Sequence, residues 1–185
     1  SSLGERVRIQ RDNYIQDTRL GSYSYTGQST RVFAADIGRF CSISWNVSIG
    51  PSEHKLETLT THPLNHDESW GVFAEADLPV AKFAGTTTVG HDVWIGCGAF
   101  LRKGVRIADG CVIGANSVVL HDTEPYGIYA GSPARLIKKR FAEETIVQLM
   151  DINLYQRSDA DILDIMKLCR GQDVDTVLIQ SLAAL

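Results

Sequence analysis

Three histidines lie within a short stretch of this 185-residue chain: His54, His62 and His66. An imidazole ionises near neutral pH, so each of them could take up a proton during a reaction or, when neutral, bind a metal ion. Zinc would need three or four such ligands directed at one point. His62 and His66 are spaced like neighbours on one helical face, but Pro63 disfavours a helix across them. We therefore expect no metal site here, and a single histidine in such a segment, taken by itself, is most simply a solvated loop residue.

The sequence on both sides of these histidines is built on a six-residue repeat. From Val89 the chain divides into VGHDVW, IGCGAF, LRKGVR, IADGCV and IGANSV, and each unit begins with an aliphatic residue. The fifth position of each unit is small or β-branched. The units IGRFCS, ISWNVS and IGPSEH repeat the pattern from Ile37, so His54 closes the last unit before a long interruption.

The spacing of six has a direct structural meaning. Position five of one unit and position one of the next are two residues apart, so in a strand their side chains face the same side. Val93 and Ile95 are therefore expected to point inward, with Trp94 between them pointing outward. Glycine, aspartate and asparagine recur at positions two to four, where a tight corner needs a permissive backbone. The pattern predicts a solenoid of short strands with a thin aliphatic core, rather than a β-sandwich, whose strands recur every 8–12 residues or so.

Residues 55–85 interrupt the repeat, because the 40 residues from Ile49 to Val89 are not a multiple of six. Excursions of this length are usually functional or disordered. This one carries apolar residues that favour an ordered arm: Trp70, Phe73, Leu78, Val80 and Phe83. We expect residues 1–135 to form one β-helical domain from which the excursion departs.

Residues 136–185 have the spacing of amphipathic helices. Ser158 followed by Asp161 resembles a capping box ahead of apolar residues at helical intervals. Gly171 is expected to end that helix, and Asp173 to cap a last one. These features predict a C-terminal helical extension that covers the solenoid or a neighbouring subunit.

The composition excludes several classes of protein. The chain has 18 lysines and arginines against 22 aspartates and glutamates, so it lacks the basic excess of a nucleic-acid-binding protein. No apolar run approaches the roughly 20 residues of a membrane span, and the first residues lack the apolar stretch of a signal peptide. The four cysteines form no CxxC pair, which favours a cytoplasmic protein with free thiols.

Several blocks of sequence together indicate a family. They are LGSYSY at 20–25, IGRFCSIS at 37–44, THPL at 61–64, GHDVWIG at 90–96, IADGCVIGANSVV at 107–119 and PYGIYAGSPARLIKKRF at 125–141. With these blocks the chain resembles the hexapeptide-repeat acyltransferases, whose fold is a left-handed parallel β-helix. More narrowly it resembles the xenobiotic acetyltransferase branch, which includes streptogramin and type B chloramphenicol acetyltransferases.

The resemblance implies transfer of acetyl from acetyl-CoA to an acceptor hydroxyl, directly within a ternary complex. A hydroxyl is a weak nucleophile at neutral pH, so a base must take its proton during the attack. The family's catalytic histidine stands where the long loop departs, which is His54 in this sequence. The resemblance also implies a homotrimer with active sites between subunits, and the flat faces of a prism favour such packing.

The resemblance further assigns residues to the two substrates. The residues expected along the cofactor are Trp94, Cys97, Ala115 and Leu120, with Arg135, Lys138 and Lys139 placed to meet its phosphates. The residues expected on the acceptor side are Tyr23, Tyr25 and His62. These residues also have a structural interpretation, since tyrosines often pack against other side chains and basic runs are usually solvated.

The sequence departs from the drug-modifying enzymes around the acceptor. Their insertion between the SYSY and FCSI blocks is missing, and residues 153–157 replace a tryptophan-rich segment. We therefore expect either a small-molecule or a saccharide acceptor. Three alternatives stay open: N-acetylation of an amino sugar, a metal enzyme like the gamma-class carbonic anhydrases, and a non-catalytic β-helix scaffold. The carbonic anhydrase pattern of two histidines five residues apart is absent from the coils.

Overall fold

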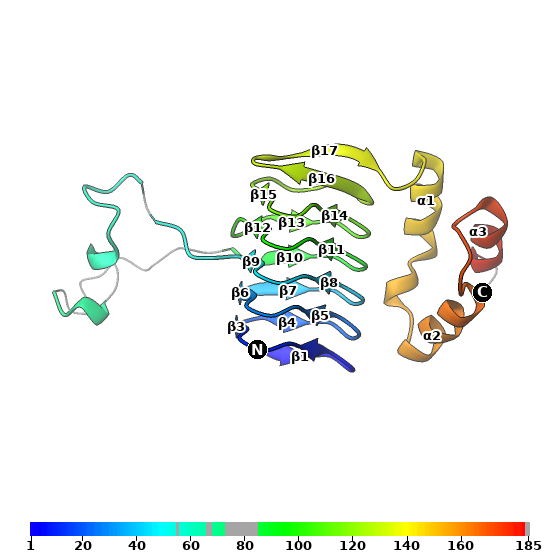
Figure 1. Ribbon diagram of the computed structural model, residues 1–185, viewed down its shortest axis with the longest axis horizontal. Coiled ribbons are helices and arrows are strands. Elements are labelled where there is room, and N and C mark those ends of the chain that lie inside the picture. The colour runs from blue at the N-terminus through cyan, green and yellow to red at the C-terminus, as the bar shows by residue number, and fades with distance from the viewer. Residues whose placement is uncertain (55, 66–67, 73–84, 184–185) are drawn as a thin grey trace.

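The chain winds into a prism of stacked β-coils, with helices along one side and the excursion on the other (Figure 1). This computed structural model describes residues 1–54, 56–65, 68–72 and 85–183. Within these residues the neighbouring strands of the coils pair parallel, and β16 and β17 at the end of the prism pair antiparallel. The predicted solenoid is therefore confirmed.

Three sheets form the faces of the prism. Sheet A contains β1 (Ser2–Leu3), β4 (Arg19–Leu20), β7 (Ala35–Ile37), β10 (Thr87–Val89) and β13 (Arg106–Ile107). Sheet B contains β2 (Arg8–Ile9), β5 (Tyr25–Thr26), β8 (Ser42–Ile43), β11 (Trp94–Ile95), β14 (Val112–Ile113), β16 (Gly127–Gly131) and β17 (Ala134–Lys139). Sheet C contains β3 (Tyr14–Gln16), β6 (Arg31–Phe33), β9 (Ser48–Ile49), β12 (Phe100–Leu101) and β15 (Val118–Val119).

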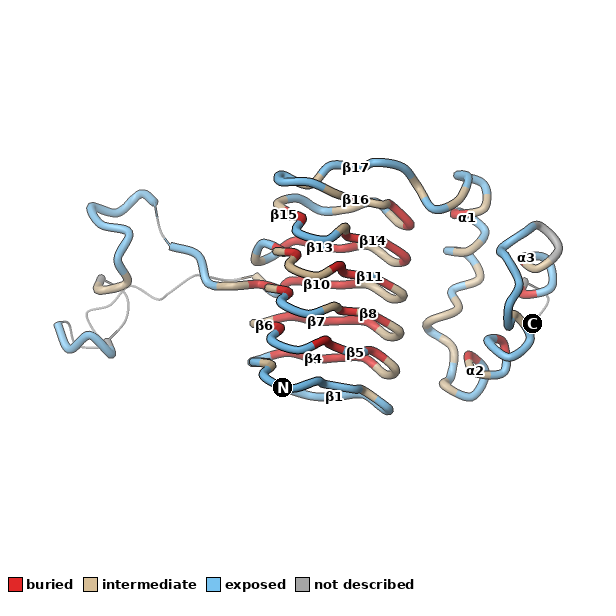
Figure 2. Tube along the Cα trace, viewed as in Figure 1, coloured by how far each residue is buried: buried red, intermediate tan, exposed pale blue. Residues whose placement is uncertain are grey.

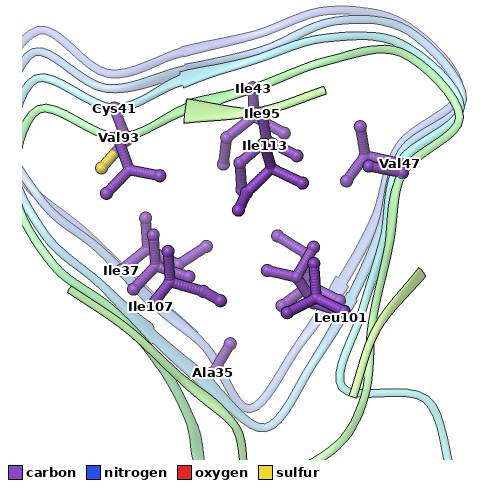
Figure 3. Close-up of a cluster of buried hydrophobic side chains, with 14 of the residues drawn as sticks. Ala35, Ile37, Cys41, Ile43, Val47, Val93, Ile95, Leu101, Ile107 and Ile113 are labelled. Carbon is purple, nitrogen blue, oxygen red and sulfur yellow. The ribbon is translucent and has the colours of Figure 1, made fainter. Parts of the chain in front are cut away.

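The core is a column of aliphatic side chains inside the prism. Ile43, Ile95 and Ile113 come from successive strands of sheet B and stack on one another, fully shielded from water (Figure 3). The other first positions of the repeat are buried in the same way (Figure 2), among them Ile37, Ile49, Leu101 and Ile107. Removing this apolar surface from water is the main driving force for winding the coils.

The three corners of the prism position the residues of interest. Corner A–B comprises residues 21–23, 38–40, 90–92 and 108–110; corner B–C comprises 27–29, 44–46, 96–98 and 114–116; corner C–A comprises 50–54, 102–104 and 120–122. At corner B–C the backbone of Asn46, Gly98 and Asn116 has positive φ of 56°, 68° and 55°. Asparagine and glycine tolerate this left-handed conformation, which explains their recurrence in the repeat.

The excursion leaves the prism after β9 and returns before β10, as the broken repeat predicted (Figure 1). The coil resumes in register, because Thr87 pairs with Ala35 of the preceding coil. Within its described residues the excursion contains two short 3-10 helices, η1 (Pro63–Asn65) and η2 (Glu68–Trp70). The apolar residues predicted to order the arm at Phe73, Leu78, Val80 and Phe83 lie outside the described residues.

The C-terminal segment forms α1 (Glu143–Ile152), η4 (Leu154–Gln156), α2 (Asp159–Leu168) and α3 (Thr176–Ala183). Ser158 is confirmed as the N-cap of α2: the backbone N–H of Asp161 donates to Oγ of Ser158 at 3.2 Å, and that hydroxyl donates to Oδ2 of Asp161 at 2.6 Å. The predicted cap of α3 is corrected, because Oδ1 of Asp175, not Asp173, accepts from the N–H of Leu178 at 2.8 Å. A cap must immediately precede the helix for its side chain to reach the first N–H groups.

The helical extension is attached to the prism at corner A–B. The ring of Tyr155 stacks on His91, with centroids 5.4 Å apart and planes 15° from parallel. Arg39 donates from Nη1 to the carbonyl oxygens of Tyr155 and Arg157, at 3.0 and 2.9 Å, and forms an ion pair with Asp159. The ring of Tyr155 covers His91, and burial lowers the pKa of this histidine.

The predicted boundary between residues 135 and 136 falls within β17, and this division into domains stays a prediction. None of the described helices has the length and apolar character that crossing a membrane would require.

Candidate functional site

His54 stands at corner C–A, where the chain leaves the last repeat before the excursion, and its side chain is exposed. Its Nδ1 lies 2.6 Å from the carbonyl oxygen of Thr61, further along the excursion. A carbonyl can only accept, so Nδ1 must carry the proton and donate it. The second ring nitrogen, Nε2, is therefore left as an acceptor, which is the form a general base requires.

Glu53 ties the start of the excursion to the next coil. Its Oε1 lies 3.9 Å from Nε of Arg102, which follows β12. Both side chains are about half exposed, so this ion pair contributes little to stability. It holds the residue before His54 against the prism.

His62 packs within the excursion. Its ring meets that of Trp70 edge-on, with centroids 4.6 Å apart, and its Nδ1 accepts from the N–H of Leu64 at 3.2 Å. His62 directly follows Thr61, whose carbonyl holds His54. His66 lies outside the described residues, and among the residues that are described no group of three or more His, Cys, Asp or Glu side chains is placed to hold a metal ion.

The residues predicted to line the cofactor divide between two corners. Cys97 and Ala115 lie at corner B–C in successive coils, where the N–H of Asn116 donates to the carbonyl of Cys97 at 2.8 Å. Trp94 projects from the neighbouring face of sheet B and is 57% exposed. Leu120 instead lies at corner C–A, one coil above Arg102, on the same edge as His54.

The basic residues lie on β17, at the end of the prism. Arg135 and Lys138 are exposed. Lys139 is already engaged, because its Nζ lies 3.1 Å from a carboxylate oxygen of Glu124 and 2.7 Å from one of Glu143. Of these three cations, Arg135 and Lys138 are therefore the more available to a phosphate.

The two tyrosines occupy different places. Tyr25 lies on the outer face of sheet B, in register with Ser42, which is in turn in register with Trp94. Tyr23 lies at corner A–B, where its ring stacks on Phe40 at 4.9 Å with planes 7° apart. One chain therefore brings Tyr25 near Trp94, while Tyr23 packs toward the helical extension.

Sequence reasoning missed Trp45, which lies at corner B–C below Cys97. The N–H of Gly98 donates to the carbonyl of Trp45 at 3.1 Å, which places Trp45 one coil before Cys97 and two before Ala115. The indole is 52% exposed. The signal was available, because Trp45 occupies the third position of its repeat just as Cys97 and Ala115 do.

Comparison with known proteins identifies the family. The family model described as bacterial transferase hexapeptide (six repeats) matches residues 86–121. A probable macrolide acetyltransferase of Lysinibacillus sphaericus is 38% identical over 141 residues, which cover 74% of this chain and 77% of that protein. The chain belongs to the hexapeptide-repeat acyltransferase family. The recognised blocks placed it in the xenobiotic acetyltransferase branch, and this assignment is confirmed.

A second relative supports the branch. A chloramphenicol acetyltransferase of Morganella morganii is 41% identical over 119 residues, or 63% of this chain, and the match spans only 56% of that protein's length. Among solved structures, the N-acyltransferase AntD of Bacillus cereus, in complex with dTDP and 3-hydroxybutyryl-CoA, superposes with a TM-score of 0.60 over 84% of this chain and 79% of AntD. At 23% identity that likeness concerns the fold alone. The left-handed β-helix and the acetyltransferase class are both confirmed.

Proposed function

We propose that this acetyltransferase moves an acetyl group from acetyl-CoA directly to a hydroxyl of a bound acceptor, with His54 as general base. The observation that carries the proposal is the 2.6 Å contact between Nδ1 of His54 and the carbonyl of Thr61, which leaves Nε2 free to accept. Nε2 takes the hydroxyl proton as the acceptor oxygen bonds to the thioester carbonyl carbon. When the C–S bond breaks, the imidazolium returns the proton to the departing thiolate.

The active site is proposed to lie between copies of the chain in a homotrimer. Within one chain His54 is at corner C–A, whereas Trp94, Cys97 and Ala115 lie on sheet B and corner B–C. Sheet C separates the two groups, so a neighbouring copy is needed to bring a base to the cofactor residues. Closed cyclic packing of prisms would place corner C–A of one copy against corner B–C of the next.

The cofactor is proposed to follow the edge of the prism. Backbone groups at Cys97 and Ala115 would hold the pantetheine arm, with Trp94 near the reacting end. Arg135 and Lys138 have no carboxylate partner among the described residues and would meet the phosphates, whereas Lys139 would have to exchange its two carboxylate partners. Leu120 lies two coils above His54 on the same edge of the prism and would contact the cofactor of a site shared between two copies.

The acceptor is proposed to be a small molecule or a saccharide that meets Tyr25 and His62. Tyr23 is a weaker candidate for the acceptor side, because its ring is already stacked on Phe40. Transfer to the amino group of an amino sugar is the second candidate, since the same base serves either nucleophile. Membership of the acetyltransferase family argues against a carbonic anhydrase or an inert scaffold.

The proposal is tested by measuring thiol release from acetyl-CoA with chloramphenicol, a macrolide, neutral methyl glycosides and amino sugars. His54→Ala is expected to lower kcat by about 100- to 10,000-fold, the usual contribution of a general base. Its thermal unfolding should not change, because the side chain is exposed.

The control is Lys167→Ala, which removes an exposed side chain in the helical extension, away from corners B–C and C–A, and should leave kcat as in the wild type. Full activity of His54→Ala would disprove the base. Turnover restricted to amino sugars would select N-transfer, and zinc in stoichiometric amount would point to a metal enzyme.

A further inference from the structure

Sheet B carries an exposed row of neutral side chains along its outer face. Tyr25, Ser42 and Trp94 are in register on three successive strands, β5, β8 and β11. Tyr25 and Trp94 are 43% and 57% exposed, so two aromatic side chains stand on either side of one small hydroxyl. No charged side chain lies between them in this row.

Trp45 adds a third aromatic group to the same place. It follows Ser42 by three residues in the same coil and is 52% exposed at corner B–C. Its carbonyl accepts from Gly98, which puts it directly below the turn that contains Cys97. Exposed aromatic side chains therefore lie on the two strands next to Ser42 and at the corner that follows it, beside the turns proposed to line the cofactor.

The hydroxyl of Ser42 is available to a ligand. The side chain is half-buried, and within the described ranges no hydrogen bond involves its Oγ. A serine hydroxyl can both donate and accept. It could therefore bind a ligand hydroxyl in either sense.

The spacing of the row restricts what fits between its aromatic residues. Adjacent strands lie about 4.8 Å apart, so Tyr25 and Trp94 are separated at the backbone by about 9.6 Å. A flat ring between two parallel rings needs only about 7–8 Å, since carbon atoms meet at about 3.5–4.0 Å. A saturated sugar ring is thicker, because its axial hydrogens stand above and below the mean plane.

We infer that Trp45, Ser42, Tyr25 and Trp94 form a binding site for the pyranose ring of a neutral saccharide. The C–H faces of the sugar would pack on the aromatic rings while one of its hydroxyls bonds Ser42. The four side chains of the site are uncharged, although Arg8 of β2 lies in register with Tyr25 at the end of the row. A planar base would not fill the spacing between Tyr25 and Trp94. A saccharide bound here would be the acceptor of the acetyl group, so this inference rests on the proposed function.

The inference is tested by direct binding of neutral methyl pyranosides, using saturation-transfer NMR and calorimetry without acetyl-CoA. Trp45→Ala is expected to weaken the bound glycoside about tenfold, the effect of losing about 1.4 kcal/mol. Trp45→Phe should restore most of that affinity, because it returns an aromatic face. The KM for acetyl-CoA should stay within twofold, while the KM for the glycoside rises with its Kd.

Two matched controls lie on sheet C. Tyr14→Ala removes an aromatic side chain of similar exposure, 53%, and should leave glycoside binding unchanged. Ser42→Ala should weaken binding, whereas Ser48→Ala, at the equivalent place on β9, should not.

The failures of the two proposals can be told apart. Glycoside binding that depends on Trp45 but occurs without acetyl transfer would support this site and overturn the proposed chemistry. Acetyl transfer with the same glycoside KM in Trp45→Ala would overturn the site alone, as would an absence of pyranoside binding. If Trp45→Ala instead dissociates the oligomer, as seen by sedimentation, the tryptophan is a subunit contact and the inference is wrong.

Discussion

The two ring nitrogens of His54 have different environments, and this difference decides which one can take a proton. Nδ1 is held by a main-chain carbonyl, that of Thr61, so no side-chain substitution at that position can remove the acceptor. The tautomer of His54 therefore depends on the path of the excursion. A shift of this segment would change the free nitrogen while leaving His54 in place.

The cysteines offer a second test at the scale of single residues. Burial raises the pKa of the Cys41 thiol to about 12, so at pH 8 it carries almost no reactive thiolate. Cys97 is only half-buried at corner B–C. We expect a thiol-specific reagent at pH 8 to modify Cys97 in the native protein and Cys41 only after unfolding.

Mass spectrometry of the labelled peptides measures this difference, with Cys97→Ser as the control for the fast site. Acetyl-CoA should slow the labelling of Cys97 if the cofactor lies along corner B–C. Labelling of Cys41 at the native rate of Cys97 would contradict its placement in the core.

Among the elements, the attachment of the helices to corner A–B depends on a few polar contacts. The Arg39 side chain is only 15% exposed and holds two carbonyls and the Asp159 carboxylate. Stacking of Tyr155 on His91 covers the same corner. The Arg39 contacts join segments more than 100 residues apart in sequence, and the repeat pattern contains neither them nor the stacking on His91.

We predict that Arg39→Ala lowers the free energy of unfolding of the helical extension by about 2–3 kcal/mol, the value of hydrogen bonds to a buried charge. Limited proteolysis and denaturant unfolding measure the effect. Lys167→Ala is the control, since its ion pair with Asp164 is exposed and should contribute about 0.5 kcal/mol or less. An equal loss of free energy of unfolding in the two variants would contradict the proposed role of Arg39 in attaching the helices.

His91 makes this attachment depend on pH. Burial lowers its pKa below the usual 6.5, so the folded protein disfavours the charged form. The unfolded chain then binds more protons below pH 6.5, and stability should fall as the pH drops from there through the folded pKa. Above pH 6.5 the protein should keep its full stability with respect to this histidine.

Unfolding measured between pH 7.5 and about 5 tests this expectation, with His91→Gln as the comparison. The variant should be less stable at neutral pH, because it loses the stacking on Tyr155, and its stability should vary less with pH. A wild-type stability that rises on acidification through this range would show the opposite sign.

For the whole molecule, the separation of the candidate site between two corners predicts complementation. We expect a species of about three times the 20.3 kDa chain in sedimentation. His54→Ala removes the proposed base, and Ala115→Trp fills the proposed cofactor edge at an exposed position. Each variant alone should be inactive.

Trimers reassembled from equal amounts of the two variants should regain activity at roughly a quarter of their sites, because a shared site can draw each intact residue from a different copy. If every site lay within one chain, mixing would restore nothing. Sedimentation of the mixed sample controls for failed assembly.

The sequence by itself determined the coils of this protein, because each six-residue unit carries its own inward aliphatic residue and its own corner residues. Ile95 and Trp94 could be assigned to opposite sides without any knowledge of distant contacts, and the family blocks located His54. Local patterns of this kind need no partner elsewhere in the chain.

Only the tertiary structure decided which corner each site residue occupies and what surrounds it. It separated Leu120 from Cys97, engaged Lys139 with two carboxylates, stacked Tyr23 on Phe40 and placed Trp45 below Cys97. These relations depend on the register between coils and on contacts across long separations in sequence. A six-residue pattern favours the same local conformation in every coil and therefore cannot specify the contacts between particular residues of different coils.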